Sequence, residues 1–212
     1  CFQIPVKSCT KDVDFNKITR FYGEGFRANH DKLFIAAAHN FATNTTAVSP
    51  ANLGFLENVL TVGSVSSTDQ RSNFSNFRTA VGIAAPGENV YGPAIRGTGN
   101  FPTTVGTTTA TCPLTSTSPF AAVVKGLCNY KTDFSGTSFA APMVTGVAAI
   151  IKSLRPTSTP EEIKDILIRA ADPLFVTSSS PEAGKLLGSD CIVTSTPPGM
   201  VLRGCRLNAF KA

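Results

Sequence analysis

The sequence predicts an α/β fold, with a mostly parallel sheet flanked by helices. Three continuous apolar segments have the character of strands buried on both faces, which is typical of a parallel sheet. Segments of helical period precede and follow them, and one begins with a capping motif. Strands that alternate with helices along one chain indicate an α/β domain.

The N-terminal half contains one expected helix and three expected strands. The helix is expected from about residue 14 to 27, where four apolar side chains share one face: Ile18, Phe21, Tyr22 and Phe26. The strands are expected over residues 32–38 (KLFIAAA), 58–65 (NVLTVGSV) and 80–87 (AVGIAAPG), and each ends in turn residues.

The C-terminal half begins with residues 92–135, which are rich in Gly, Thr and Ser and predict an inserted set of loops or hairpins. A helix is then expected over 138–154, apolar enough to be buried on all sides and ended by Arg155-Pro156. A second helix is expected from the capping box at Thr159 to about residue 171. A Ser- and Pro-rich loop leads to the end of the chain.

Length and composition fit one folded domain, since the chain has 212 residues, of which 42% are hydrophobic and 16% charged. The net charge is +5, but Lys and Arg are scattered and do not interleave with aromatic residues. This argues against a nucleic-acid-binding surface. No apolar run approaches the roughly 20 residues that span a bilayer, so no membrane span is expected.

The six cysteines form three pairs that are local in sequence: Cys1/Cys9, Cys112/Cys128 and Cys191/Cys205. Local disulfides in an oxidising compartment are expected, although six cysteines allow 15 pairings and reduced, buried thiols are the alternative. No CxxC spacing occurs and the chain has two histidines, which argues against a zinc site.

A candidate site lies where Gly136-Thr137-Ser138 meets the helix expected over 138–154. Pro142 is tolerated only near a helix start, so the helix should begin at the serine and place Ser138 at its positive end. Asn40 follows an expected buried strand, where an amide can donate to a substrate oxygen. Taken alone, Ser138 is equally explained as a helix cap and Asn40 as a turn residue.

Together these segments resemble the subtilisin-like serine proteases, the subtilases. GTSFAAPMVTGVAAI is similar to their nucleophile motif, and IAAAHN to the strand whose last Asn belongs to the oxyanion hole, with His39 where Gly is usual. SPANLGFLENVLTVGSV, QRSNFSNFRTAVGIAAPGENVYG and RLNAFKA resemble further segments in the family's order. The resemblance implies a three-layer subtilisin-like fold, of which residues 1–212 are the C-terminal part and 92–135 an insertion.

The resemblance also implies roles for individual residues. Ser138 would be the nucleophile, and Asn40 with the backbone N–H of Ser138 would hold the oxyanion. An uncharged specificity pocket for small or medium apolar side chains would be formed by Ala36, Ala37, Ala38, His39, Val48, Ser49, Gly136 and Thr137. No cofactor is expected; structural calcium is possible because the family often binds it, although no loop here clusters carboxylates.

The motifs that carry the catalytic Asp and His in subtilases are missing. His30 and His39 match neither motif; Asp12 and Asp14 are explained as helix caps, and Asp133 falls outside the motif order. Because the chain starts at Cys1, we expect a processed, secreted protease whose N-terminal fragment, with the Asp and His, stays bound as a partner. This chain alone would then be inactive. The alternatives are a truncated half and a pseudoprotease subunit that binds a peptide or partner protein.

Overall fold

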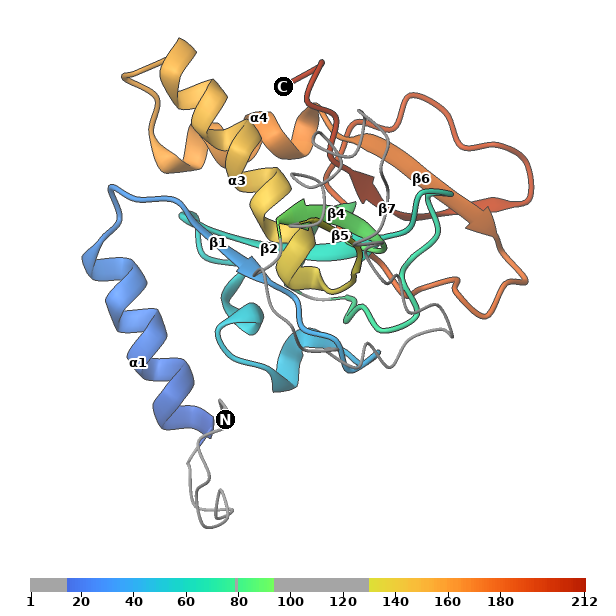
Figure 1. Ribbon diagram of the computed structural model, residues 1–212, viewed down its shortest axis with the longest axis horizontal. Coiled ribbons are helices and arrows are strands. Elements are labelled where there is room, and N and C mark those ends of the chain that lie inside the picture. Colours follow the sequence, from blue (N-terminus) through green and yellow to red (C-terminus); the bar gives the residue numbers. More distant parts are fainter. Residues whose placement is uncertain (1–14, 79, 94–129) are drawn as a thin grey trace, which may run out of the picture.

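The computed structural model describes residues 15–78, 80–93 and 130–212 (Figure 1). It is a mixed α/β structure with a mostly parallel sheet and flanking helices, which confirms the predicted fold class. The elements in chain order are α1 (Phe15–Ala28), β1 (Phe34–Ala37), η1 (Thr45–Ala47), η2 (Ala51–Leu53), β2 (Val59–Val65), β3 (Val81–Pro86), β4 (Val90–Pro93), β5 (Tyr130–Phe134), α3 (Thr137–Leu154), α4 (Pro160–Arg169), β6 (Asp172–Thr177) and β7 (Met200–Arg206).

The main sheet has five strands in the order β1-β2-β3-β7-β6. The first four are parallel, and β6 runs antiparallel to β7. In the register of the first pair, Phe34 lies opposite Val59 and Ala37 opposite Val62. The segments that follow β1, β2 and β3 therefore emerge at the same edge of the sheet, where α/β proteins place their sites.

Burial of the three predicted strands depends on their position in the sheet. All seven residues of β2 are buried, and most of β3 is buried, as their apolar sequences predict. By contrast, every residue of β1 is half-buried, so the expectation of burial on both faces is wrong for this strand. The reason is that β1 is an edge strand in the described part of the chain.

Two clusters of buried residues cover the two faces of the sheet. On one face, side chains of β2 and β3 pack against α3 and α4; this cluster includes Leu60, Val62, Ile83, Val144, Ile151, Ile163 and Leu167. On the other face, Val65, Val81 and Ala84 pack with Leu174 and with Leu187 from the loop before β7. β2 and β3 therefore contribute to the hydrophobic core on both faces of the sheet.

The central helix α3 is not buried on all sides, contrary to expectation. It packs against β1, β2, β3 and α4, while Met143, Ile150 and Leu154 are 41%, 58% and 77% exposed. Only one face of the helix meets the sheet in the described chain, which explains the difference. Of the described helices, α3 alone is long and apolar enough to pass for a membrane span, and it packs here with one face against the sheet.

The second predicted helix begins as the sequence indicates. Thr159 caps α4: its hydroxyl accepts from the N–H of Glu162 at 3.2 Å, and Glu162 accepts from the N–H of Thr159 at 2.9 Å. This reciprocal pair satisfies two N–H groups that the first turn of a helix leaves free, and it confirms the capping box.

The C-terminal region contains two strands, β6 and β7, where the sequence predicted only loop. Pro173 in β6 and the charged residues of β7 interrupt the apolar pattern that marks the other strands. Cys191 and Cys205 form a disulfide, with 5.7 Å between their Cα atoms, and this confirms one predicted pair. The pairs Cys1/Cys9 and Cys112/Cys128 lie outside the described residues.

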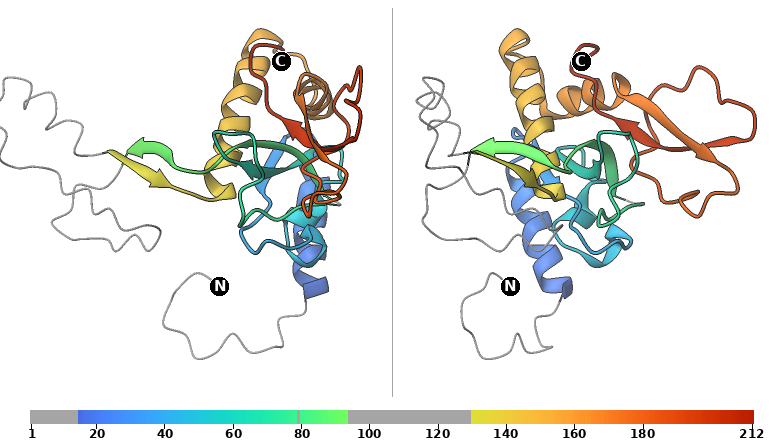
Figure 2. Two further views of the ribbon diagram at one scale, coloured as in Figure 1. Left: turned by 90° about the vertical axis from the view of Figure 1, so that its right-hand side faces the viewer. Right: turned by 45° about the vertical axis from the view of Figure 1, so that its right-hand side comes forward.

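The predicted insertion begins and ends in a two-stranded antiparallel sheet made by β4 and β5. Val90 lies opposite Phe134, and Pro93 opposite Tyr130. Figure 2 shows this pair projecting from the body of the molecule beside the N-terminal end of α3. Residues 94–129 lie outside the part of the chain that the structure describes.

Candidate active site

The start of α3 is fixed by contact with the end of β3. The N–H of Gly136 donates to the carbonyl of Gly87 at 2.7 Å. Gly136 has φ 153° and ψ 154°, a conformation essentially limited to glycine. A Cβ on Gly87 would lie only 2.8 Å from the carbonyl oxygen of Gly136 and 3.0 Å from Cβ of Ala140. The two glycines therefore allow the strand and the helix to meet at this point.

Ser138 is the second residue of α3 and is exposed. The helix begins at Thr137, one residue earlier than expected, and Pro142 is its sixth residue. The N–H groups of the first turn have no partner within the helix, and the helix dipole favours negative charge there. The Ser138 hydroxyl is thus presented at a helix end that attracts a negative oxygen.

Asn40 joins this helix end to the end of β1. Its side-chain Oδ1 accepts from the N–H of Thr137 at 2.9 Å and from the hydroxyl of Thr137 at 3.0 Å. Because both donors engage the oxygen, the amide orientation is fixed and Nδ2 is left to donate elsewhere. A Cβ on Gly136 would lie 3.2 Å from that Nδ2. The structure therefore brings Asn40 against the Gly136-Thr137-Ser138 segment.

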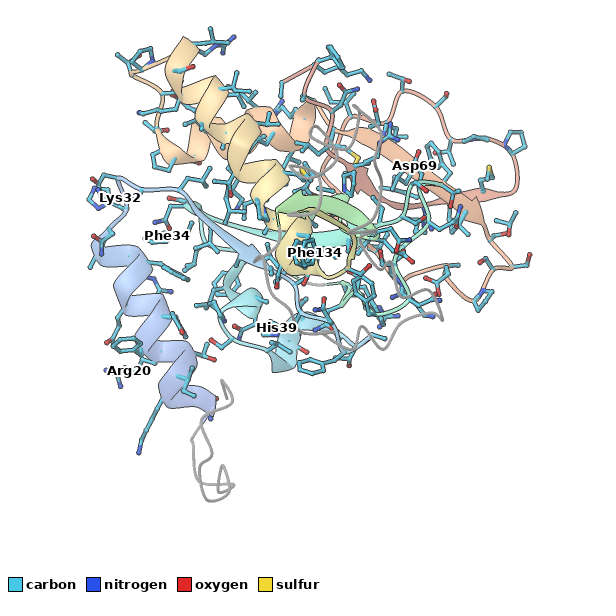
Figure 3. The ribbon with its side chains drawn as sticks, viewed as in Figure 1. Arg20, Lys32, Phe34, His39, Asp69 and Phe134 are labelled. Carbon is cyan, nitrogen blue, oxygen red and sulfur yellow. A yellow bond between two sulfur atoms is a disulfide. The ribbon has the colours of Figure 1, made fainter. Side chains whose placement is uncertain are left out.

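His39 lies beside Asn40 in a left-handed conformation, with φ 74°. Its half-buried ring stacks on Phe41, with 5.8 Å between ring centres and 12° between planes. Burial lowers the pKa of His39, which keeps the ring uncharged at neutral pH. Figure 3 labels His39 just beyond β1 and Phe34 at the start of that strand.

The other predicted pocket residues lie in three places. Ala36 and Ala37 are half-buried on β1, whereas Ala38 has no exposed surface and packs in the core. Val48 and Ser49 are half-buried between η1 and η2. The uncharged pocket remains a prediction.

His30 is not placed to serve as a base for Ser138. His30 precedes β1 while Asn40 follows it, so the strand separates His30 from the helix end. His30 lines a hollow of about 480 Å³ near the N-terminal ends of β1 and β2, together with Asp31, Glu57 and Lys152. Within the described ranges no carboxylate is hydrogen-bonded to either imidazole, so no base with its orienting acid is present in them.

Among the described residues, no group of three or more His, Cys, Asp or Glu side chains could hold a metal ion. The candidate acids Asp12 and Asp14 lie outside the described residues, and Asp133 belongs to β5.

Sequence reasoning missed two features of the site: the hydrogen bonds from Thr137 to Asn40, and the close approach of Gly87. Asn40, Thr137 and Gly87 all stand inside segments that resemble the family. The contact between Asn40 and Thr137 spans 97 residues, however, and it can be predicted only if the strand register is known. A glycine directly after a buried strand was the available signal for a close approach.

Comparison with known proteins identifies the family. A sequence model described as Subtilase family matches residues 7–190. The chain is 28% identical to an extracellular protease of Xanthomonas campestris over 166 residues, which is 78% of this chain and 24% of that protein. It is 36% identical to subtilisin-like protease 1 of Pseudogymnoascus destructans over 116 residues, 55% of this chain and 26% of that protein.

Solved structures share the fold. The prenylagaramide maturation protease PagA has a TM-score of 0.54 at 24% identity, covering 91% of this chain and 53% of PagA. A protease of Pseudoalteromonas arctica has a TM-score of 0.52 at 24% identity, covering 91% of this chain and 45% of that one. The chain thus spans about a quarter of these curated relatives and about half of the solved chains. On the match over residues 7–190, this chain belongs to the subtilase family.

Proposed function

We propose that the chain is the nucleophile-bearing part of a subtilisin-like serine endopeptidase, with Ser138 as nucleophile. The observation that carries the proposal is the contact between Asn40 and Thr137 directly beside an exposed Ser138. It joins a hydroxyl at the positive end of a helix to an amide that emerges from the sheet.

The chemistry is acyl transfer. Oγ of Ser138 forms a bond to the carbonyl carbon of a peptide, and the carbonyl oxygen takes up negative charge. Nδ2 of Asn40 and the N–H of Ser138 donate to this oxyanion, an interaction that is strongest in the transition state. The amine then leaves, water cleaves the acyl-enzyme, and Ser138 is regenerated. Loss of one oxyanion donor costs on the order of 100- to 1000-fold in turnover, a range that comes from a subtilisin.

The proton of the Ser138 hydroxyl needs a base, and the base needs an acid to orient it. The chain has two histidines: β1 separates His30 from the helix end, and His39 matches neither family motif that carries the catalytic Asp or His. We therefore assign the catalytic His and Asp to an N-terminal portion of the same precursor, and we expect this chain alone to be inactive. The lengths of the relatives support this assignment.

The surface around β1 also supports an N-terminal partner. β1 has one neighbour in the described sheet, and an unpaired apolar edge strand is a template for another strand. Nearby, Phe21 on α1 and Met143 on α3 are 73% and 41% exposed. A partner that extended the sheet beyond β1 would cover such apolar surface.

The substrate is proposed to be a peptide or protein with a small or medium apolar side chain before the cleaved bond. Ala36, Ala37, His39, Val48 and Ser49 would line the pocket, and the buried residues Ala38, Gly136 and Thr137 would lie behind them. None of these side chains offers the carboxylate that a basic side chain would need, and His39 is uncharged at neutral pH.

Secretion and proteolytic activation of a zymogen complete the proposal. Relatives include proteases named extracellular, and the Cys191–Cys205 disulfide suits an oxidising compartment.

The test is labelling of the processed, full-length protein with a fluorophosphonate, which reacts with activated serines. Ser138 should label, and Ser138→Ala should abolish labelling. Ser153→Ala is the matched control, because Ser153 is an exposed serine at the far end of the same helix, and it should label normally. The chain of residues 1–212 alone should not label. Absence of labelling in the processed full-length protein contradicts the proposal and favours the pseudoprotease, which would bind a peptide without cutting it.

A further inference from the structure

The loop that carries Asn40 has an unfavourable backbone that something else must hold in place. His39 and Ala42 both lie in the left-handed region, with φ 74° and 51°. L-residues with a side chain adopt this region at a steric cost, and they keep it only where the surroundings impose it. The two residues bracket Asn40, so the position of its amide depends on what imposes their conformation.

The neighbouring segment Phe74–Phe77 provides those contacts, mainly through Asn76. The N–H of Asn76 donates to the carbonyl of His39 at 3.0 Å. Its side-chain Oδ1 accepts from the N–H of Phe41 at 2.9 Å and from the N–H of Thr43 at 3.2 Å. One residue thus holds the backbone on both sides of Asn40.

Further backbone bonds extend the contact, from Ala42 to the carbonyl of Phe74 at 2.8 Å and from Phe77 to the carbonyl of Thr43 at 3.0 Å. These bonds do not involve the side chain of Asn76. They keep the two segments together, so a change confined to that side chain should alter the loop without unfolding it.

Asn76 is itself fixed to the core of the sheet. It is fully buried, and its carbonyl accepts from the hydroxyl of Ser75 at 3.0 Å. The same hydroxyl accepts from the N–H of Ser64 in β2 at 2.9 Å. A guanidinium N–H of Arg71 donates to the carbonyl of Ser75 at 2.8 Å. The support of the loop therefore continues into β2, one of the most buried strands.

Only one end of the Asn76 amide is used. Nδ2 is buried and has no hydrogen-bond partner among the described residues, whereas Oδ1 accepts two bonds. A side chain chosen for stability alone would not leave a buried donor unpaired. The acceptor is thus the feature of Asn76 that the loop requires.

We infer that Asn76 is a positioning residue, which holds the Asn40 amide where it meets a developing oxyanion. This inference rests on the proposed role of Asn40 and adds a residue that does not touch the substrate. Replacement of Asn76 should therefore lower turnover only through its effect on the position of Asn40.

The first experiment replaces Asn76 in the processed, full-length protease. Asn76→Leu removes the acceptor and should lower kcat about a hundredfold, since misplacement of a catalytic group by about 1 Å has that effect, while KM changes less than about threefold. Asn76→Asp keeps an acceptor at the same place and should restore most of kcat. An unchanged kcat in Asn76→Leu, or no recovery in Asn76→Asp, overturns the inference.

Asn58→Leu is the matched control for loss of a buried asparagine. Asn58 donates to the carbonyls of Phe26, Asn29 and Lys32 just before β2, at the end of the sheet opposite the site. This variant should lower the melting temperature yet leave kcat within about twofold of wild type. If both variants lower kcat equally, Asn76 has only a general structural role.

A double-mutant cycle separates action through Asn40 from independent damage. If Asn76 acts through Asn40, Asn40→Ala combined with Asn76→Leu should reduce kcat no further than Asn40→Ala alone. Losses that multiply overturn the inference.

Hydrogen exchange on the full chain gives a readout that does not depend on catalysis. The amides of Phe41 and Thr43 should exchange slowly in wild type and quickly in Asn76→Leu, while that of Val62 in β2 stays protected. If the wild-type protease proves inactive, the proposed function fails and exchange alone decides whether Asn76 holds the loop. Retained protection of Phe41 and Thr43 overturns the inference in either case.

Discussion

The two edges of the five-stranded sheet differ sharply in chemistry. At one edge β6 contains Pro173, which has no N–H, and Asp172, whose carboxylate accepts from Arg206 and Asn208 at 2.9 Å each. At the other edge β1 reads Phe-Ile-Ala-Ala, without charge or proline. Proline and charge are the usual means by which proteins stop an edge strand from pairing. The β6 edge is therefore protected against pairing with another strand, whereas β1 has the composition of a strand that pairs on both sides.

The flanks behind these edges repeat the contrast. The region next to β6 and β7, called the closed flank below, is cross-linked by the Cys191–Cys205 disulfide and by an ion pair between the buried Arg71 and Glu182 at 2.7 Å. On the β1 side, called the open flank below, Phe21 of α1 is largely exposed. In the proposed protease the first flank is complete within this chain, and the second is completed by the N-terminal portion.

The largest expected effect tests whether β1 pairs with the N-terminal portion. The N–H groups of Phe34 and Ala38 bond to carbonyls before and within β2, so by strand alternation Ile35 turns its N–H outward. Ile35→Pro removes that donor and leaves its acceptor unpaired, which should weaken association by about 3–4 kcal/mol, roughly a hundredfold or more. Co-purification of the N-terminal portion measures it.

Ile35→Val is the control for that experiment, because it keeps the outward N–H and should associate normally. If Ile35→Pro still retains the N-terminal portion at wild-type strength, β1 is not the pairing edge.

A smaller effect concerns the disulfide of the closed flank. Replacing Cys191 and Cys205 together with Ser frees a loop of 14 residues in sequence separation, which should lower the free energy of unfolding by about 3 kcal/mol. Urea unfolding of residues 1–212 measures the loss. Phe21→Ser on the open flank should change the same quantity by less than about 0.5 kcal/mol, because its ring is already largely in water. Equal losses in the two variants would remove the contrast between the flanks.

The smallest effect is a pH dependence at the Arg71–Glu182 pair. A hydrogen bond from Arg71 lowers the pKa of Glu182 from 4.5 to about 2, so the ionised carboxylate stabilises the folded state. That stabilisation is fully present above pH 4.5 and is lost as the pH falls toward 2. Because the carboxylate is partly exposed, we expect the loss to be on the order of 2 kcal/mol.

The measurement for this pair is urea unfolding at pH 5 and pH 2.5 in wild type and Glu182→Gln. Wild type should lose more stability than the variant over this interval. Parallel curves would show that the pair adds nothing to the closed flank.

The sequence predicted those elements whose hydrophobic period is uninterrupted. α1, β2, β3 and α4 lie close to their expected bounds, because buried apolar runs and a capping box are local signals. β6 and β7 escaped prediction because their burial depends on tertiary contacts. Arg203 of β7 is 1% exposed and donates to Gln70 and to the carbonyl of Asp69, which no local pattern indicates.

The candidate site was predictable as residues but not as an arrangement. Ser138 and Asn40 follow from motifs that resemble a family, and the helix start was expected within one residue. The support of Asn40 by Asn76 depends on how two loops meet beyond β1 and β2. Such contacts are set by the register of the parallel strands, which the sequence does not state.

The hydrogen bond between Gly136 and Gly87 has a consequence for evolution of the family. This bond joins the end of β3 to the start of α3, and a second bond beside it runs from the N–H of Asn89 to the hydroxyl of Ser135 at 3.0 Å. Lengthening or exchanging the chain between Asn89 and Ser135 changes chain entropy slowly and leaves both bonds untouched. In the proposed protease, lineages could therefore exchange the segment between β4 and β5 while Ser138 keeps its place.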